Sequence, residues 1–285
     1  PFLIAITAPE STRHRSLPRW LGRRGMRTTA VVPKGPPGFS TLFAHDFQSV
    51  HAATVWRADS VADAAIDQLA PGDPRPFFMW VHFFEPHEPM GEDPGAPDFG
   101  NTLEERYDRD VAYCDIQLGR LLRAIDALPP RRPTAVLIAS DHGEVLSNGV
   151  QAHGLDLSLD AIRIVLIAKG PGLSRGVESS PVSLVDVVPT VLAWTKTPGP
   201  SWLDGRDLRA PLPDRIVLVD LFRHGFDGKK FLDQSVAIDR SDRITDDLLL
   251  GTKTLARADD RGRPPAPLGP PLPQRLDAAL GAYLE

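Results

Sequence analysis

Short apolar runs alternate along the chain with segments in which apolar residues recur every three or four positions. The runs predict buried strands, and the recurrent segments predict amphipathic helices. We expect strands over residues 2–7, 27–32, 77–84, 134–140, 162–168 and 216–221, with two further antiparallel strands within 231–256. We expect helices over residues 16–25, 59–69, 102–128, 188–194 and 275–284.

This alternation predicts an α/β fold with a mostly parallel sheet and helices on both faces. We assign residues 1–225 to an α/β domain. Residues 226–285 form a small C-terminal α+β extension with short strands, a Pro-rich loop and a terminal helix. Because ligands of such sheets gather at the carboxyl ends of the strands, we expect chemistry just after Phe84 and Ser140.

The longest expected helix, from Thr102 to Leu128, carries one apolar stripe that we expect to face the core. The stripe consists of Leu103, Tyr107, Val111, Cys114, Leu118, Leu121 and Ile125. Cys114 lies in the middle of this stripe, so we interpret it as a buried core thiol.

Composition narrows the classes of function. The chain has 285 residues and a formal net charge of −5, and this mild acidity argues against a protein that binds nucleic acid along its phosphates. The single cysteine excludes an internal disulfide framework and a multi-cysteine zinc site. No apolar run reaches the ~20 residues of a membrane span, so we expect none in this chain. The first residue is proline, which favours a processed protein or a fragment and leaves an upstream span open.

The strongest local motif is Ser140-Asp-His-Gly-Glu144, at the end of an expected buried strand. Gly143 permits an unusual turn, so Asp141 and His142 can converge on one cation. Hard divalent ions prefer carboxylate oxygens and tolerate a neutral imidazole. Two ligands are too few for a tight site, so others must come from elsewhere. The alternative is a turn in which Asp141 caps backbone amides and His142 is solvated.

A second motif, His82-Phe-Phe-Glu-Pro-His-Glu-Pro89, follows another expected strand. Pro86 and Pro89 restrain the loop that carries His87, so this histidine is well placed as a general acid or as a donor to an oxyanion. The alternative is an ordinary turn bounded by prolines. His82 lies within the strand, and we interpret it as a hydrogen-bonded core histidine.

A third histidine, His153, lies in Gln151-Ala-His-Gly154, twelve residues after Asp141. It can return to the site that Asp141 and His142 define, or it can lie on a surface loop. The clustering of three histidine-containing loops near the ends of strands favours a common site.

Taken in order and spacing, five segments resemble the sulfatases of the alkaline phosphatase superfamily. They are Phe77–Pro89, Tyr107–Leu122, Thr134–Gly154, Arg163–Gly172 and Ser183–Thr190, the last of which is followed by Asp204-Gly205.

The resemblance implies hydrolysis of sulfate esters with one divalent cation, most often Ca²⁺ and in some relatives Mn²⁺ or Mg²⁺. It implies that Asp141 and His142 are metal ligands. It implies that His87 contacts the ester and helps the leaving oxygen depart, and that His153 binds the sulfuryl oxygens. A cation and two histidines supply the positive charge and the proton that this transfer requires.

Two elements of the family pattern have no match. The family's nucleophile is a formylglycine made from Cys or Ser in a Cys-x-Pro-x-Arg sequence, which this chain lacks. The metal-binding aspartates that normally follow the first strand are also unmatched. We therefore expect the α/β domain to be N-terminally incomplete. Thr12 beside Arg13 is an alternative nucleophile, because phosphoglycerol-transferring relatives use threonine.

The resulting expectation is a metal-dependent sulfuric ester hydrolase. One alternative is a phosphoester hydrolase or a phosphoglycerol or phosphoethanolamine transferase of the same superfamily. Another is a truncated, catalytically inactive domain that binds an anionic glycan or a partner chain. The expected ligand is a sulfated or phosphorylated small molecule or glycan, and the resemblance favours the cell envelope, the periplasm or secretion.

Overall fold

The structure is a computed structural model. It describes residues 16–35, 38–69, 73–87, 95–129, 133–147, 150–212, 215–224, 230–240, 242–257, 266–267 and 274–284. The expected strand at Phe2–Thr7 and the pair Thr12 and Arg13 lie outside these residues. The contacts divide the chain into unit 1, residues 1–135 and 191–200, and unit 2, residues 136–190 and 201–285.

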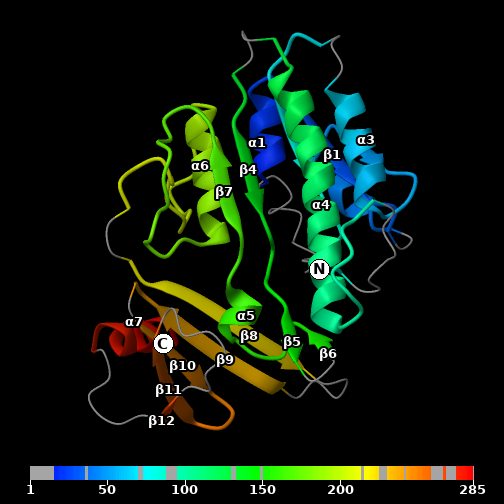
Figure 1. The fold of residues 1–285 in the computed structure, drawn as a ribbon. Helices are drawn as coiled ribbons and strands as arrows, with labels where there is room; N and C mark the ends of the chain where they lie inside the picture. Colours follow the sequence, from blue (N-terminus) through cyan, green and yellow to red (C-terminus); the bar gives the residue numbers. More distant parts are fainter. Residues whose placement is uncertain are drawn as a thin grey trace. The chain divides into compact units, whose positions relative to one another are not determined.

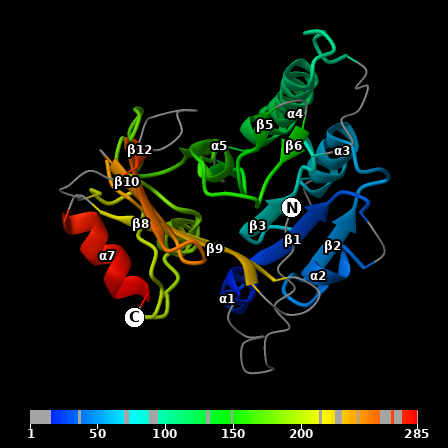
Figure 2. The ribbon, with the colours of Figure 1, turned by 90° about the horizontal axis from the view of Figure 1, so that it is seen from below.

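Unit 1 is built on a parallel sheet of three described strands (Figure 2). The middle strand is β1 (Arg27–Val32), whose last five residues are all buried. β2 (Ser49–Ala52) and β3 (Phe77–Val81) pair with it on either side. The β-branched residues of β1 suit this position, because a strand between two neighbours is covered on both faces. The α/β fold with a parallel sheet is thereby confirmed.

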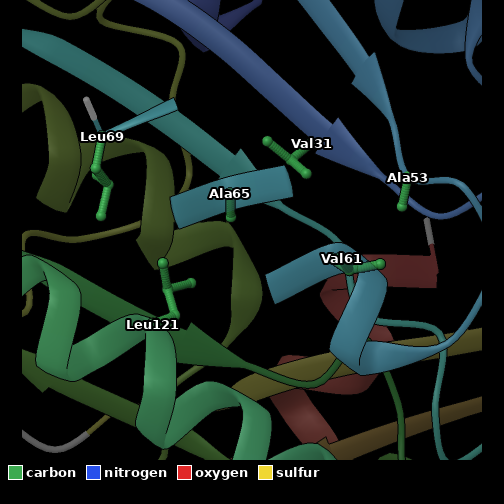
Figure 3. Packing of buried hydrophobic residues seen from close by; sticks show 6 residues of the cluster. All are labelled: Val31, Ala53, Val61, Ala65, Leu69 and Leu121. Atoms are coloured by element: carbon green, nitrogen blue, oxygen red, sulfur yellow. The ribbon is translucent and has the colours of Figure 1, made fainter. Parts of the chain in front are cut away.

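Unit 1 contains the described helices α1 (Leu17–Arg23), α2 (Thr41–Ala44), α3 (Ala58–Gln68) and α4 (Leu103–Asp126) (Figures 1 and 2). Val61 and Ala65 of α3 pack with Val31 of β1 and Leu121 of α4 (Figure 3). Small residues on α3 let the helix lie close to the sheet. α4 begins with a capping box, in which Thr102 and Glu105 each accept a hydrogen bond from the other's backbone N–H.

The buried face of α4 differs from the expected stripe. It consists of Asp110, Tyr113, Gln117 and Leu121. Val111 is 43% exposed, so the stripe is wrong in the first half of the helix. The physical reason is a polar contact that sets the rotation of α4 about its own axis. Arg57 Nη2 donates to the Tyr113 hydroxyl at 2.7 Å, which places Tyr113 on the buried face. Cys114 is half-buried rather than a buried core thiol.

Unit 2 contains two small antiparallel strand pairs and a larger antiparallel sheet. β4 (Val136–Ala139) pairs with β7 (Leu166–Lys169), and β5 (Val145–Ser147) pairs with β6 (Val150–Ala152). The larger sheet has the order β12-β11-β10-β9-β8. Its strands are β8 (Val217–His224), β9 (Lys230–Ile238), β10 (Asp242–Asp247), β11 (Thr252–Arg257) and β12 (Ala266–Pro267). Leu276 and Leu280 of α7 (Gln274–Leu284) pack against Ile244.

The pairing in unit 2 departs from expectation in detail. The strands expected over 134–140 and 162–168 are present in shorter form, but they pair antiparallel. β7 begins only at Leu166, because Leu159–Ile162 forms the short helix α5. The strand expected over 216–221 is β8, which belongs to the antiparallel sheet. The helix expected over 188–194 is α6 (Val187–Trp194). The division at residue 225 stays a prediction.

The segment Ser183–Thr190 stabilises the fold through hydrogen bonds to a buried carboxylate. Asp186 is fully buried, and its oxygens accept from Arg215 Nη1 at 2.8 Å, from Arg206 N at 2.8 Å and from Ser183 N at 2.8 Å. Gly205 lies against this turn, since a Cβ there would be 1.9 Å from the Val185 carbonyl oxygen. The Asp-Gly at 204–205 therefore serves the fold, because only glycine allows this approach.

Gly143, in the turn after β4, is in close contact with α5. Its N–H donates to the Ala161 carbonyl at 2.7 Å. A Cβ on Gly143 would lie 2.0 Å from the Asp160 carbonyl oxygen and 2.9 Å from that of Arg163. These neighbours are backbone atoms, so they cannot move aside as a flexible side chain can. The packing of α5 therefore requires glycine at this position and fixes the turn that carries Asp141 and His142.

No helix within the described ranges has both the length and the apolar character that crossing a membrane requires.

We predict that Gly143→Ala lowers the free energy of unfolding by about 1–3 kcal/mol, because the added methyl group collides with the α5 backbone. Urea denaturation followed by circular dichroism measures this change. The matched control is Gly119→Ala on α4, where a Cβ would meet only the end of the Arg123 side chain at 3.5 Å. That control should retain or gain stability, by up to about 1 kcal/mol. Equal stability of Gly143→Ala and the wild type would contradict the packing argument.

Candidate functional site

Asp141 and His142 follow β4 in a bend. Asp141 Oδ1 accepts from the backbone N–H of His142 at 3.0 Å, which holds the carboxylate beside its neighbour. The Asp141 side chain is 59% exposed, so the carboxylate can reach a ligand from solvent. The turn itself is held by the contact of Gly143 with α5 in the same unit.

The His142 ring has one nitrogen in use and one without a partner. Nδ1 lies 2.7 Å from the Gly143 carbonyl oxygen. Because a carbonyl only accepts, Nδ1 must carry the hydrogen, and in the neutral ring the lone pair is then on Nε2. Nε2 is buried and has no hydrogen-bond partner. Among the described residues, the nearest carboxylate oxygen is Asp141 Oδ2 at 3.8 Å, which is too long for a hydrogen bond.

This arrangement fits two ligands of a divalent cation. A buried ring nitrogen without a partner costs free energy, and a bound cation removes that cost. Metal-ligating histidines commonly have their other nitrogen tied to a carbonyl or carboxylate, as Nδ1 is here. Two bonds of about 2.3–2.6 Å, the range for Ca²⁺, can span the separation of Oδ2 and Nε2. Within the described ranges, no group of three or more His, Cys, Asp or Glu side chains is arranged to hold a metal, so Asp141 and His142 do not by themselves complete a metal site.

His153 joins this pair through the hairpin of β5 and β6. The register places Val145 opposite Ala152, so the residues just outside this pair, Glu144 and His153, flank the same end of the hairpin. His153 Nδ1 lies 3.1 Å and 3.2 Å from the two carboxylate oxygens of Glu144. The rings of His142 and His153 stack with their centroids 4.2 Å apart. The structure thus brings Asp141, His142 and His153 together within unit 2.

His87 belongs to unit 1 and is described there by itself. It follows β3, and its N–H donates to the Phe84 carbonyl at 3.1 Å. Its ring contacts the Phe84 ring with centroids 4.6 Å apart, and Trp56 meets Phe84 edge-on at 6.0 Å. The loop therefore holds the imidazole in a defined orientation. His82 is half-buried, and its ring lies 5.8 Å from that of Phe39.

Glu85 anchors the His87 loop to the start of α3. The Glu85 side chain is buried, and Oε1 accepts from the N–H of Ala58 at 2.6 Å. A carboxylate is favourable at a helix N-terminus, where the first N–H groups have no partner within the helix. Arg57 lies beside this contact, and its hydrogen bond to Tyr113 raises the pKa of the guanidinium. Burial raises the pKa of the Tyr113 hydroxyl. Near pH 7, Arg57 therefore stays charged and Tyr113 stays neutral.

Sequence reasoning did not assign roles to Glu85 and Glu144. Both carboxylates are buried beside a candidate histidine. For Glu144 the sequence held a signal, because Asn148-Gly149 is a dipeptide typical of two-residue hairpins. A hairpin centred there places Glu144 opposite His153. For Glu85 there was no local signal, since its partner Ala58 is distant in the sequence.

The family model described as Sulfatase matches residues 4–197 of this chain. Steryl-sulfatase from Mus musculus is 35% identical over 165 residues, which cover 52% of this chain and 26% of that protein. The uncharacterized sulfatase YidJ from Escherichia coli is 33% identical over 234 residues, which cover 65% of this chain and 46% of that protein. The chain therefore spans less than half the length of these relatives.

Solved structures share the fold. A protein in the alkaline phosphatase superfamily from Vibrio parahaemolyticus superposes with a TM-score of 0.68 at 16% identity, over 93% of this chain and 64% of that one. A second structure, solved in complex with its substrate D-glucosamine-2-N,6-O-disulfate, gives a TM-score of 0.63 at 14% identity, over 85% of this chain and 75% of that one. The family match extends over both units and includes every candidate site residue. The chain therefore belongs to the sulfatase family.

Proposed function

We propose that this chain carries part of the site of a metal-dependent sulfuric ester hydrolase. The observation that carries the proposal is the buried Nε2 of His142, which has no partner and lies beside the Asp141 carboxylate. A buried acceptor of this kind is costly in a folded protein unless a ligand uses it. Asp141 and His142 would hold a divalent cation, with Ca²⁺ the first candidate and Mn²⁺ or Mg²⁺ the alternatives.

The overall reaction consumes one water, breaks the bond between sulfur and the leaving oxygen, and yields an alcohol and hydrogen sulfate. The bound cation would neutralise charge on the sulfuryl oxygens and polarise the ester. His153 would bind a sulfuryl oxygen through its ring. His87 would donate a proton to the oxygen of the departing alcohol, which otherwise leaves as a high-energy alkoxide.

A sulfated sugar is the substrate class that we propose. The support comes from the structural neighbour that was solved with D-glucosamine-2-N,6-O-disulfate as its substrate. A sugar sulfate is an alkyl ester, so its leaving oxygen needs a proton more than the oxygen of an activated phenol does. The proposed role of His87 therefore agrees with this substrate class.

A binding function without turnover is the second candidate. It is favoured by the absence of a Cys-x-Pro-x-Arg sequence from the chain. It is also favoured by the absence, among the residues that the structure describes, of a group of three or more His, Cys, Asp or Glu side chains arranged to hold a metal. Such a domain would bind a sulfated glycan without hydrolysing it.

We predict that isothermal titration calorimetry of this chain detects binding of Ca²⁺, Mn²⁺ or Mg²⁺. His142→Ala and Asp141→Asn should each weaken that binding by at least about 10-fold, because each removes a ligand. His45→Ala is the matched control, since His45 is an exposed histidine in unit 1, and it should bind as the wild type does. Absence of binding to the wild type, or equal binding by His142→Ala, would remove the cation from the proposal.

We predict that, in a longer polypeptide that also supplies a nucleophile, His87→Ala reduces turnover of glucosamine 6-sulfate by a factor of about 10² or more, the range of general-acid catalysis. The loss should be much smaller for 4-nitrophenyl sulfate, whose leaving group departs without protonation. Steady-state kinetics on both esters measure this difference, with His45→Ala as the control. An equal effect on the two esters would remove His87 as the proton donor. A wild-type chain that binds sulfated sugar and hydrolyses neither ester would establish the binding function instead.

A further inference from the structure

The two stacked imidazoles of unit 2, those of His142 and His153, each make a hydrogen bond through their own Nδ1. His142 Nδ1 lies 2.7 Å from the Gly143 carbonyl oxygen, and His153 Nδ1 lies 3.1 Å from Glu144 Oε1. A carbonyl and a carboxylate only accept hydrogen bonds. Each Nδ1 therefore carries a hydrogen, and Nε2 is the nitrogen through which each ring can contact a ligand. The stacking fixes the two rings relative to each other at an interplanar angle of 30°.

The partner of His153 is a buried carboxylate. The Glu144 side chain is only 6% exposed, while the His153 side chain is 20% exposed. Both carboxylate oxygens lie within hydrogen-bond distance of Nδ1, at 3.1 and 3.2 Å. Burying a carboxylate costs free energy unless a hydrogen-bond donor contacts it. The contact between Glu144 and His153 is therefore a buried hydrogen bond rather than a surface ion pair.

The position of Glu144 follows from the hairpin. It immediately precedes β5, and His153 immediately follows β6, so the pairing of Val145 with Ala152 sets their separation. Gly143, the residue before Glu144, is held by its hydrogen bond to Ala161 of α5. The backbone on both sides of Glu144 is therefore fixed, which lets one carboxylate define the orientation of the ring.

We propose that Glu144 is a positioning residue that sets the tautomer and the ring orientation of His153. Which nitrogen of a histidine acts is determined by the hydrogen bond that the other nitrogen makes. With Nδ1 held by Glu144, Nε2 is the atom directed at a bound oxyanion, and the protonated ring donates its Nε2–H to that oxyanion. This inference rests on the proposed function, in which His153 binds a sulfuryl oxygen. Without the carboxylate, the ring can turn over and exchange its two nitrogens.

Nitrogen-15 NMR of the histidine rings tests this role without any need for catalysis. In the neutral state, His153 of the wild-type chain should show the tautomer with hydrogen on Nδ1. Glu144→Ala removes the acceptor and should shift the majority of His153 to the tautomer with hydrogen on Nε2. Glu144→Gln keeps an amide oxygen as an acceptor and should retain the Nδ1 tautomer. Glu104→Gln on the exposed side of α4 is the matched control and should change nothing.

The wild-type spectrum is decisive even where a variant fails to fold. Hydrogen mainly on Nε2 of His153 in the wild type would overturn the inference, and so would a tautomer that Glu144→Ala leaves unchanged. A titration with inorganic sulfate gives the functional readout. Glu144→Ala should weaken sulfate binding by about 10-fold or more, the effect typical of losing a residue that orients a site histidine, and Glu144→Gln should restore much of it.

The two readouts separate this inference from the proposed function. A chain whose His153 tautomer depends on Glu144, but which binds no sulfate, supports the positioning role and contradicts the proposed function. A chain that binds sulfate equally with and without Glu144 supports the proposed anion site and contradicts the positioning role.

Discussion

The candidate site of unit 2 depends on one backbone contact, the approach of Gly143 to α5. A side chain at this position would collide with the carbonyl oxygens of Asp160 and Arg163. The contact fixes the turn after β4, and the Gly143 carbonyl in turn accepts from His142 Nδ1. A steric constraint on one glycine thus determines which nitrogen of a neighbouring histidine carries a lone pair. The buried, unpartnered Nε2 that results is the feature on which the metal proposal rests.

The same principle, a buried carboxylate that holds a histidine or its loop, occurs in both units. In unit 2 Glu144 contacts His153 directly, and in unit 1 Glu85 anchors the His87 loop to the first N–H group of α3. Asp186 is also a buried carboxylate, but its role is purely structural, because its side-chain partner Arg215 is buried with it. Family motifs therefore mix residues that can meet substrate with residues that hold the fold, and only their contacts distinguish the two.

Local patterns in the sequence predicted much of the fold. The β-branched run Arg27–Val32 and the recurrence of apolar residues over Thr102–Leu128 both lead to the expected elements. The rotation of α4 was not predictable, because Tyr113 is drawn inside by Arg57, a residue far away in the sequence. The convergence of Asp141, His142 and His153 followed from clustering at strand ends, whereas the antiparallel pairing of β4 with β7 depends on tertiary contacts that periodicity does not encode.

We propose that His142 Nε2 and the Asp141 carboxylate face one cation. Crystals of this chain can be soaked in Mn²⁺ and measured at the manganese absorption edge to locate the ion. We expect an anomalous peak within about 2.0–2.5 Å of both atoms, as first-row divalent ions and Ca²⁺ are bound by oxygen and nitrogen ligands. A His142 Nε2 that instead donates or accepts a hydrogen bond within the protein, with manganese bound elsewhere, would contradict it.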